Sequence, residues 1–225
     1  MRGKNPIRPP ISGDGQNLQL KNIFATLQGE GLHVGVPSVF VRLGGCNLTC
    51  NFCDTDFEDF VKTPLADIMA QIDKLSRNHE NLRVRKLVVI TGGEPLRQNI
   101  APFCEMLLSD GFSVQIETNG TLYRELPMEV DIICSPKNTG QGYMQLRDDL
   151  LRRVSALKFI ISASDSGYKD VSEVGQSMYD IPVFVQPMDE YDEVKNAANT
   201  SLALDLSLER GYRLSLQTHK ILKIE

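Results

Sequence analysis

The chain has 225 residues, of which 41% are hydrophobic and 24% charged, as is ordinary for a soluble globular protein of one domain. Its net charge of −5 argues against non-specific binding to nucleic acid, which requires a basic surface. No stretch approaches the roughly 20 apolar residues that cross a bilayer, and the N-terminus lacks the apolar core of a secretory signal. We therefore expect a cytoplasmic protein whose five cysteines are thiols or metal ligands.

The first 19 residues are rich in proline, glycine and polar residues, so we expect a mobile N-terminal arm over 1–19. From 20 to 225, short apolar runs alternate with longer mixed segments. The runs span 39–43, 86–90, 113–117, 130–134, 156–161, 182–186 and 212–216. Several are continuous β-branched stretches, which are typical of parallel strands covered on both faces.

Segments with helical spacing lie between these runs. We expect a helix over LADIMAQIDKL, with Thr63 as its N-cap and Pro64 at its first position. Residues 99–110 and 190–208 are also expected to be helical. The alternation predicts an α/β fold with a parallel sheet. A complete eightfold barrel takes about 250 residues. We therefore expect 20–225 to form an incomplete TIM-type βα barrel with about six parallel strands.

Polar or glycine-rich segments follow five of the runs: a cysteine loop, TGGEP, ETNG, SPK and QP. The carboxyl ends of parallel strands meet at one edge of a sheet, where ligands bind in α/β folds. The sequence therefore predicts that these five segments converge on one site.

The cysteine loop follows the first run and has the spacing C-x3-C-x2-C, with Cys46, Cys50 and Cys53. Three thiolates in so short a loop point to a soft metal site, either zinc or an iron–sulfur cluster. A closed zinc site needs four ligands. The alternatives for a fourth are His33, Cys104 and Cys134. Cys104 and Cys134 lie in apolar segments that favour ordinary buried residues.

Three ligands leave one iron of a 4Fe-4S cluster open to the amino and carboxylate groups of S-adenosylmethionine. The loop, with Phe52 before its last cysteine, and TGGEP at 91–95 together resemble the radical S-adenosylmethionine superfamily. The resemblance implies reductive cleavage to a 5′-deoxyadenosyl radical, and implies that a GGEP backbone and carboxylate approach the methionine ammonium. Gly92 and Gly93 would leave room for that ligand, although GGEP by itself is equally typical of a turn.

Three further features bear on the substrate. TLQGEG at 26–31 is either a substrate-binding segment or a glycine turn with a surface glutamate. Arg42 lies near the end of an otherwise apolar run, and its planar fork suits a substrate carboxylate. Thr55 either ligates Mg²⁺ through its hydroxyl or caps a turn. His219, a lone histidine, is more typical of a structural residue.

Jointly, the motifs over 20–225 resemble the 7-carboxy-7-deazaguanine synthase family of queuosine and 7-deazapurine biosynthesis. The resemblance rests on TLQGEG, FVRLGGCNLTCNFCDT, VVITGGEP, QIETNG, SPK, QP and LSLQTHK. It implies conversion of 6-carboxy-5,6,7,8-tetrahydropterin to 7-carboxy-7-deazaguanine with loss of ammonia, after hydrogen abstraction at C6. S-adenosylmethionine is regenerated in this family, and Mg²⁺ assists.

The resemblance also implies roles for individual residues. Those along S-adenosylmethionine would be Phe52, Cys53, Asp54, Gly93, Glu117, Ser135, Pro136, Lys137 and Gln186. Those at the substrate would be Leu27, Gln28, Gly29, Glu30, Arg42, Thr91 and the backbone carboxylate of Glu225. Cys46, Cys50 and Cys53 would hold the cluster, and Thr55 would ligate Mg²⁺.

The resemblance further implies a homodimer and a reductant such as flavodoxin or ferredoxin, with no nucleic-acid or membrane partner. Two other interpretations remain open. One is a radical activase that acts on a protein, which would not require TLQGEG, Arg42 or QTHK. The other is a non-catalytic domain held by zinc or used for electron transfer.

Overall fold

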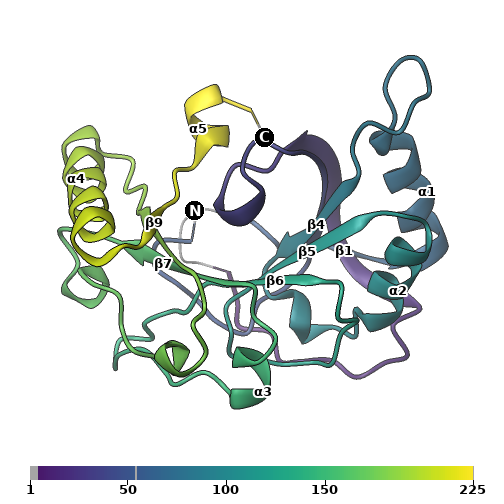
Figure 1. The fold of residues 1–225 in the computed structure, drawn as a ribbon. Coiled ribbons are helices and arrows are strands. Elements are labelled where there is room, and N and C mark those ends of the chain that lie inside the picture. The colour runs from purple at the N-terminus through teal and green to yellow at the C-terminus, as the bar shows by residue number, and fades with distance from the viewer. Residues whose placement is uncertain (1–4, 54, 225) are drawn as a thin grey trace.

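A single nine-stranded sheet organises the chain in the computed structural model, which describes residues 5–53 and 55–224 (Figure 1). Seven strands run parallel in sequence order, and β3 and β9 lie at the two ends without pairing to each other. The parallel strands are β2 (Pro37–Leu43), β4 (Leu87–Gly92), β5 (Ser113–Thr118), β6 (Asp131–Cys134), β7 (Ala156–Ile161), β8 (Val183–Pro187) and β9 (Arg213–Leu214). The predicted incomplete barrel is confirmed, since the sheet stays open, with seven parallel strands where about six were expected; the last, β9, has only two residues.

Two antiparallel strands extend one edge of this sheet and were not predicted. The long strand β1 (Asn17–Leu27) pairs with β2 on one side and with β3 (Val61–Pro64) on the other. In β1 the buried residues Leu18 and Leu20 are separated by the polar, half-buried Gln19. This alternation is typical of a half-buried strand. β1 begins three residues before the predicted domain boundary, and the mobility of 1–19 stays a prediction.

The described residues also form five α-helices and four short 3-10 helices, which lie between the strands except for the last α-helix, after β9. The α-helices are α1 (Leu65–Ser76), α2 (Ala101–Ser109), α3 (Asp148–Leu151), α4 (Glu193–Arg210) and α5 (Thr218–Leu222). The 3-10 helices are η1 (Gly31–His33), η2 (Pro95–Arg97), η3 (Ser166–Tyr168) and η4 (Gln176–Met178). Figure 1 shows α1 and α2 beside one half of the sheet and α4 beside the other. No described helix has both the length and the apolar character needed to cross a membrane.

The three predicted helices are confirmed, but the predicted cap of the first is wrong. Pro64 is the N-cap residue of α1, and Thr63 belongs to β3. The Thr63 hydroxyl donates to the carbonyl of Val61 at 3.2 Å instead of to the helix. Pairing with β1 keeps Thr63 in an extended strand, so tertiary pairing overrides the local capping preference.

The core lies between the sheet and its helices. All four residues of the run Leu87–Ile90 are at most 3% exposed, as expected for a parallel strand covered on both faces. Cys104 in α2 and Cys134 in β6 are fully buried thiols, and burial raises the pKa of both. They behave as small apolar core residues.

Candidate active site

A cavity of about 640 Å³ lies at the carboxyl edge of the parallel strands. Its lining includes strand-end residues from across the sheet: Arg42, Thr91, Gly92, Glu117, Thr118, Ile160, Gln186 and Pro187. Ser135 and Lys137, which follow β6, also line it. All five polar or glycine-rich segments therefore contribute to one cavity, and the predicted convergence is confirmed.

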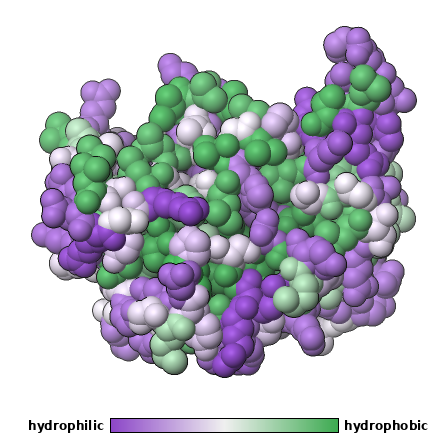
Figure 2. Space-filling model, viewed as in Figure 1, coloured by the Kyte–Doolittle hydropathy of each residue, from purple (hydrophilic) through white to green (hydrophobic). Residues whose placement is uncertain are grey.

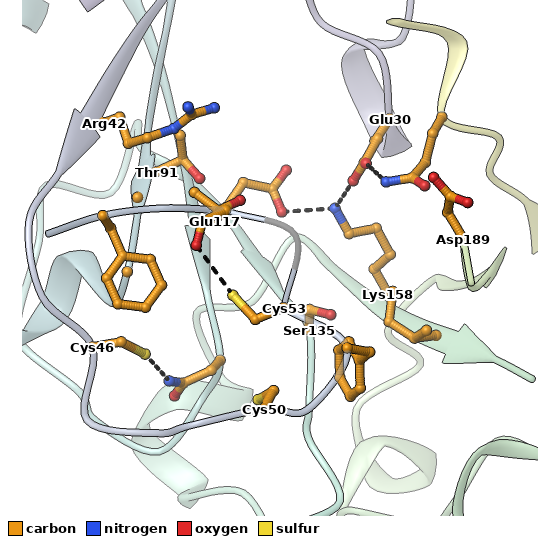
Figure 3. Close-up of a pocket in the computed structure, with 18 of the residues that line it drawn as sticks. Glu30, Arg42, Cys46, Cys50, Cys53, Thr91, Glu117, Ser135, Lys158 and Asp189 are labelled. Atoms are coloured by element: carbon orange, nitrogen blue, oxygen red, sulfur yellow. Dashed lines mark hydrogen bonds and ion pairs between the residues drawn. The ribbon is translucent and has the colours of Figure 1, made fainter. Parts of the chain in front are cut away.

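The cysteine loop forms one wall of this cavity. Cys46, Cys50 and Cys53 all line it, and Figure 3 shows their side chains around one corner. Among the described residues, no three Cys, His, Asp or Glu side chains meet closely enough to hold a single metal ion. Burial raises the pKa of Cys46 to about 11 and also raises that of Cys50. The donor set of three soft thiols fits an iron–sulfur cluster, in which each thiolate binds a different iron.

None of the three alternatives for a fourth ligand lines this cavity. Cys104 and Cys134 are in the core, and His33 pairs with Asp131 at 2.8 Å between Nε2 and Oδ2. The cavity is therefore lined by the three loop cysteines and by none of the three residues considered as a fourth ligand.

The glycines of TGGEP allow a close backbone contact that was not predicted. A Cβ added at Gly92 would lie 2.0 Å from the carbonyl oxygen of Leu43, and one at Gly93 would lie 2.1 Å from that of Gly45. The end of β4 thus packs directly against the start of the cysteine loop, where no side chain fits. Gly92 and Gly93 also line the cavity, and the room that they would leave for a ligand stays a prediction.

The carboxylate of Glu94 does not line the cavity, so its expected approach to a methionine ammonium is wrong. Glu94 is fully buried and accepts hydrogen bonds from Leu96 N (2.9 Å), Thr118 Oγ1 (2.8 Å) and Asn119 N (2.7 Å). Asn119 itself lines the cavity, and its amide lies 3.8 Å from the Cys46 sulfur. Glu94 therefore joins the ends of β4 and β5 and positions Asn119 beside the cysteine loop.

Arg42 and Thr91 form a second wall. They are direct neighbours in the parallel register of β2 and β4, and Figure 3 shows them side by side. The Arg42 guanidinium lies 5.2 Å from the centre of the Phe24 ring, which also lines the cavity. Thr55 lines the cavity as well, and its carbonyl accepts a hydrogen bond from Asn5 Nδ2 at 2.9 Å.

A buried lysine organises the wall opposite. Lys158 Nζ lies 2.5 Å from Glu30 Oε2 and 2.9 Å from Glu117 Oε2 (Figure 3). Gln217 Nε2 donates to the other oxygen of Glu30 at 2.9 Å. Burial raises the pKa of Glu30, but the charge and hydrogen bonds around it outweigh burial and lower its pKa to about 2. Burial raises the pKa of Glu117, and Lys158 only partly opposes this.

Sequence reasoning missed Lys158, although one signal was present. The side chain of Lys158 is only 5% exposed, within the apolar run ALKFII. A charge in such a run needs a buried partner. Asp189 and Lys220 also line the cavity, without a predicted role, and so does His219, for which a structural role was expected. Lys220 Nζ pairs with Asp189 Oδ2 at 3.0 Å, which ties α5 to the chain after β8.

The remaining predicted residues divide into three groups. Those that line the cavity are Leu27, Gln28, Gly29, Phe52 and Gln186, together with Ser135 and Lys137. Lys137 Nζ donates to Ser135 Oγ at 2.5 Å. Pro136 is buried but does not line the cavity. Asp54 and Glu225 lie outside the described residues.

Comparison with known proteins agrees with this geometry. The model of the Radical SAM superfamily matches residues 40–139. A 7-carboxy-7-deazaguanine synthase of Rickettsia prowazekii is 57% identical over all of this chain and 96% of its own length. One from Rhodospirillum rubrum is 42% identical over the full length of both. The crystal structure of QueE from Escherichia coli matches 89% of this chain and 94% of that chain, with 26% identity and a TM-score of 0.68. The chain therefore belongs to the 7-carboxy-7-deazaguanine synthase family of radical S-adenosylmethionine enzymes.

Proposed function

We propose that this chain converts 6-carboxy-5,6,7,8-tetrahydropterin to 7-carboxy-7-deazaguanine, with loss of ammonia, in queuosine or 7-deazapurine biosynthesis. One observation carries the proposal. The three-cysteine loop, the Arg42–Thr91 pair and the TLQGEG segment all line the same cavity. A radical generated beside the cysteines would therefore meet a substrate held by the other two.

Cys46, Cys50 and Cys53 would hold a 4Fe-4S cluster with one open iron. When bound, the cluster and S-adenosylmethionine supply a 5′-deoxyadenosyl radical that abstracts hydrogen from C6 of the pterin. The task of the chain is to hold both molecules in one orientation and to exclude water. Cys46 is buried, whereas Cys50 and Cys53 are partly exposed, so bound ligands would complete the exclusion of water at this wall.

The residues proposed along S-adenosylmethionine that line the cavity are Phe52, Gly93, Glu117, Ser135, Lys137 and Gln186. Asp54 and Pro136 complete this set. Lys137 donates two hydrogen bonds to Ser135, one to its hydroxyl and one to its carbonyl, so the SPK segment is held rigid. A rigid segment after β6 provides fixed donors and acceptors for the nucleoside.

We propose that the pterin lies between Arg42 and Glu30. The Arg42 guanidinium would bind the C6 carboxylate, and Thr91 beside it would add a hydroxyl. Glu30 would accept hydrogen bonds from the amino-pyrimidine edge, and Lys158 and Gln217 keep it ionised and fixed. The segment Leu27, Gln28 and Gly29 would contact the ring, and the terminal carboxylate of Glu225 would close the pocket.

Thr55 is proposed as a ligand of Mg²⁺. Its side of the cavity carries oxygen-bearing residues, including Asp56. Mg²⁺ requires hard oxygen ligands and retains several waters, so one hydroxyl with substrate oxygens completes an acceptable set. The ion would neutralise the carboxylated substrate and hold its C6 toward the radical.

The partners are proposed from surface chemistry and family membership. Figure 2 shows apolar residues gathered on the side of the molecule where Figure 1 places α5. Ile221 and Leu222 of α5 are 66% and 57% exposed. We propose that the chain is a homodimer, because apolar exposure of this kind favours association. We also propose a cytoplasmic location, a flavodoxin- or ferredoxin-type reductant, and no nucleic-acid partner.

Anaerobic turnover tests this proposal. Reconstituted protein would receive dithionite, S-adenosylmethionine, Mg²⁺ and the carboxylated tetrahydropterin, and 7-carboxy-7-deazaguanine would be measured by mass spectrometry. Release of 5′-deoxyadenosine without a deazapurine would support a different radical enzyme. A colourless protein with stoichiometric zinc would instead support the zinc-held domain.

A further inference from the structure

The segment that precedes β1 lies directly against the cysteine loop. Arg8 N donates to the carbonyl oxygen of Cys46 at 2.7 Å, and Ile7 pairs with Cys46 as a parallel bridge. The first cluster cysteine is thus bonded through its backbone to a residue 38 positions earlier. That bond fixes the point at which the loop leaves the sheet.

The same segment also holds the far end of the loop. Asn5 Nδ2 donates to the carbonyl oxygen of Thr55 at 2.9 Å, two residues after the last cysteine. Arg8 pairs through Nη2 with Glu58 Oε2 at 2.5 Å. The arm therefore contacts the chain at the first of the three cysteines and again after the last.

A buried cation attaches the arm to the domain. Arg97, only 2% exposed, donates from Nη1 to the carbonyl of Pro9 at 3.1 Å and from Nη2 to that of Gly44 at 2.9 Å. Arg124 Nη2 donates to the carbonyl of Ile11 at 2.8 Å. Arginines with several donors hold two backbone segments in one geometry. Arg97 thus joins the arm to the residue that begins the cysteine loop.

The loop depends on such outside contacts because residues 47–53 contain no helix or strand. Asn5 lines the active-site cavity, whereas Ile7 lines a second hollow of about 520 Å³ that also contains Cys50. The cysteine loop lies between the active-site cavity and this second hollow, and the arm lines both. Its position suits it to limit movement of the loop in either direction.

We infer that residues 5–11 are a clamp that fixes the cysteine loop, with Asn5 and Arg8 as positioning residues. Composition predicts a mobile arm, but these contacts favour a fixed one. The inference rests on the proposed function only in assuming that the loop receives the cluster. The clamp itself is a property of the protein without cofactor.

Thiol labelling of the anaerobic, cofactor-free full-length protein tests the clamp. Arg8→Ala removes the pair with Glu58, Arg8→Pro also removes the N–H donor to the loop, and Asn5→Ala removes the bond to Thr55. Arg210→Ala, which removes an exposed ion pair on α4, is the control. Alkylation of each cysteine would be followed by mass spectrometry.

The clamp predicts that Arg8→Pro speeds alkylation of the loop cysteines about five-fold, the factor expected for loss of about one net hydrogen bond. Asn5→Ala and Arg8→Ala should raise the alkylation rate of the loop cysteines less, and the control variant should label at the wild-type rate. Cys104, buried in α2, reports global opening and should label unchanged. Wild-type labelling in all three clamp variants would overturn the inference, and so would a parallel rise at Cys104 in each.

A second measurement separates this inference from the proposed function. After reconstitution, air should bleach the absorbance near 400 nm faster in Arg8→Pro than in wild type. If the wild-type protein forms no cluster at all, the proposed function fails. The labelling result would still show whether the arm fixes the cysteine loop.

Discussion

Lys158→Met removes the cation that pairs with both Glu30 and Glu117 and leaves two carboxyls in one buried site. The methionine keeps most of the apolar stem, so the change is mainly one of charge. Removing one partner of a buried ion pair costs about 3–5 kcal/mol, because the remaining charge stays buried without compensation. We expect a loss of about 3 kcal/mol in the free energy of unfolding at pH 7, since the Gln217 bond to Glu30 remains.

The loss should depend on pH in a defined direction. In the wild type the pKa of Glu30 is lowered to about 2, so its contribution is fully present above the unfolded pKa of about 4.3 and is lost as the pH falls toward 2. In Lys158→Met, burial without the cation raises the pKa of both carboxyls above the unfolded value. The variant therefore recovers stability as the pH falls from 7 toward 5, and the difference from wild type shrinks.

Urea unfolding of the anaerobic, cofactor-free protein at pH 7, 6 and 5 measures this difference. The slope of free energy against urea should stay unchanged, which shows that the same surface unfolds. Lys195→Met is the matched control, because Lys195 is 50% exposed and pairs with Glu190 at 3.0 Å. Its loss should stay below about 1 kcal/mol. The reasoning is refuted if both variants lose the same amount, or if the loss at Lys158 does not change with pH.

Three other substitutions have distinct expected results. Cys50→Ala should lose the cluster absorbance and all turnover, whereas Cys104→Ala, in the core, should keep both. Thr55→Ala should keep the cluster but respond less to added Mg²⁺ in steady-state rates, and an unchanged Mg²⁺ titration would remove Thr55 from its role. Gly93→Ala places a Cβ 2.1 Å from the Gly45 carbonyl, so chemical denaturation should show about 1–3 kcal/mol of destabilisation; wild-type stability would mean that the loop readily moves away.

The parallel half of the sheet could be predicted because its strands are short, continuous apolar runs. The antiparallel edge could not, because β1 has polar residues between its buried ones and its start lies in a segment that resembles a flexible arm. Thr63 shows the same limit: its sequence is typical of a helix cap, but long-range pairing with β1 decides its conformation.

The site could be predicted where a motif follows a strand end, since the topology alone brings such ends together. The direction in which a side chain points could not be predicted. Glu94 turns into the core to bond the end of β5, and the glycine before it accommodates Gly45. Lys158 was missed because its two partners come from segments 128 and 41 residues away.

Turnover with substrate deuterated at C6 tests the central claim most directly. If the thiols, Arg42 and the TLQGEG segment form one active site, the protein should produce 7-carboxy-7-deazaguanine and transfer deuterium to recovered S-adenosylmethionine. Arg42→Lys should form the cluster and yet make this transfer far more slowly, because a lysine cannot bind a carboxylate through two parallel bonds. Product without deuterium transfer, or no deazapurine from fully reconstituted protein, would contradict the account.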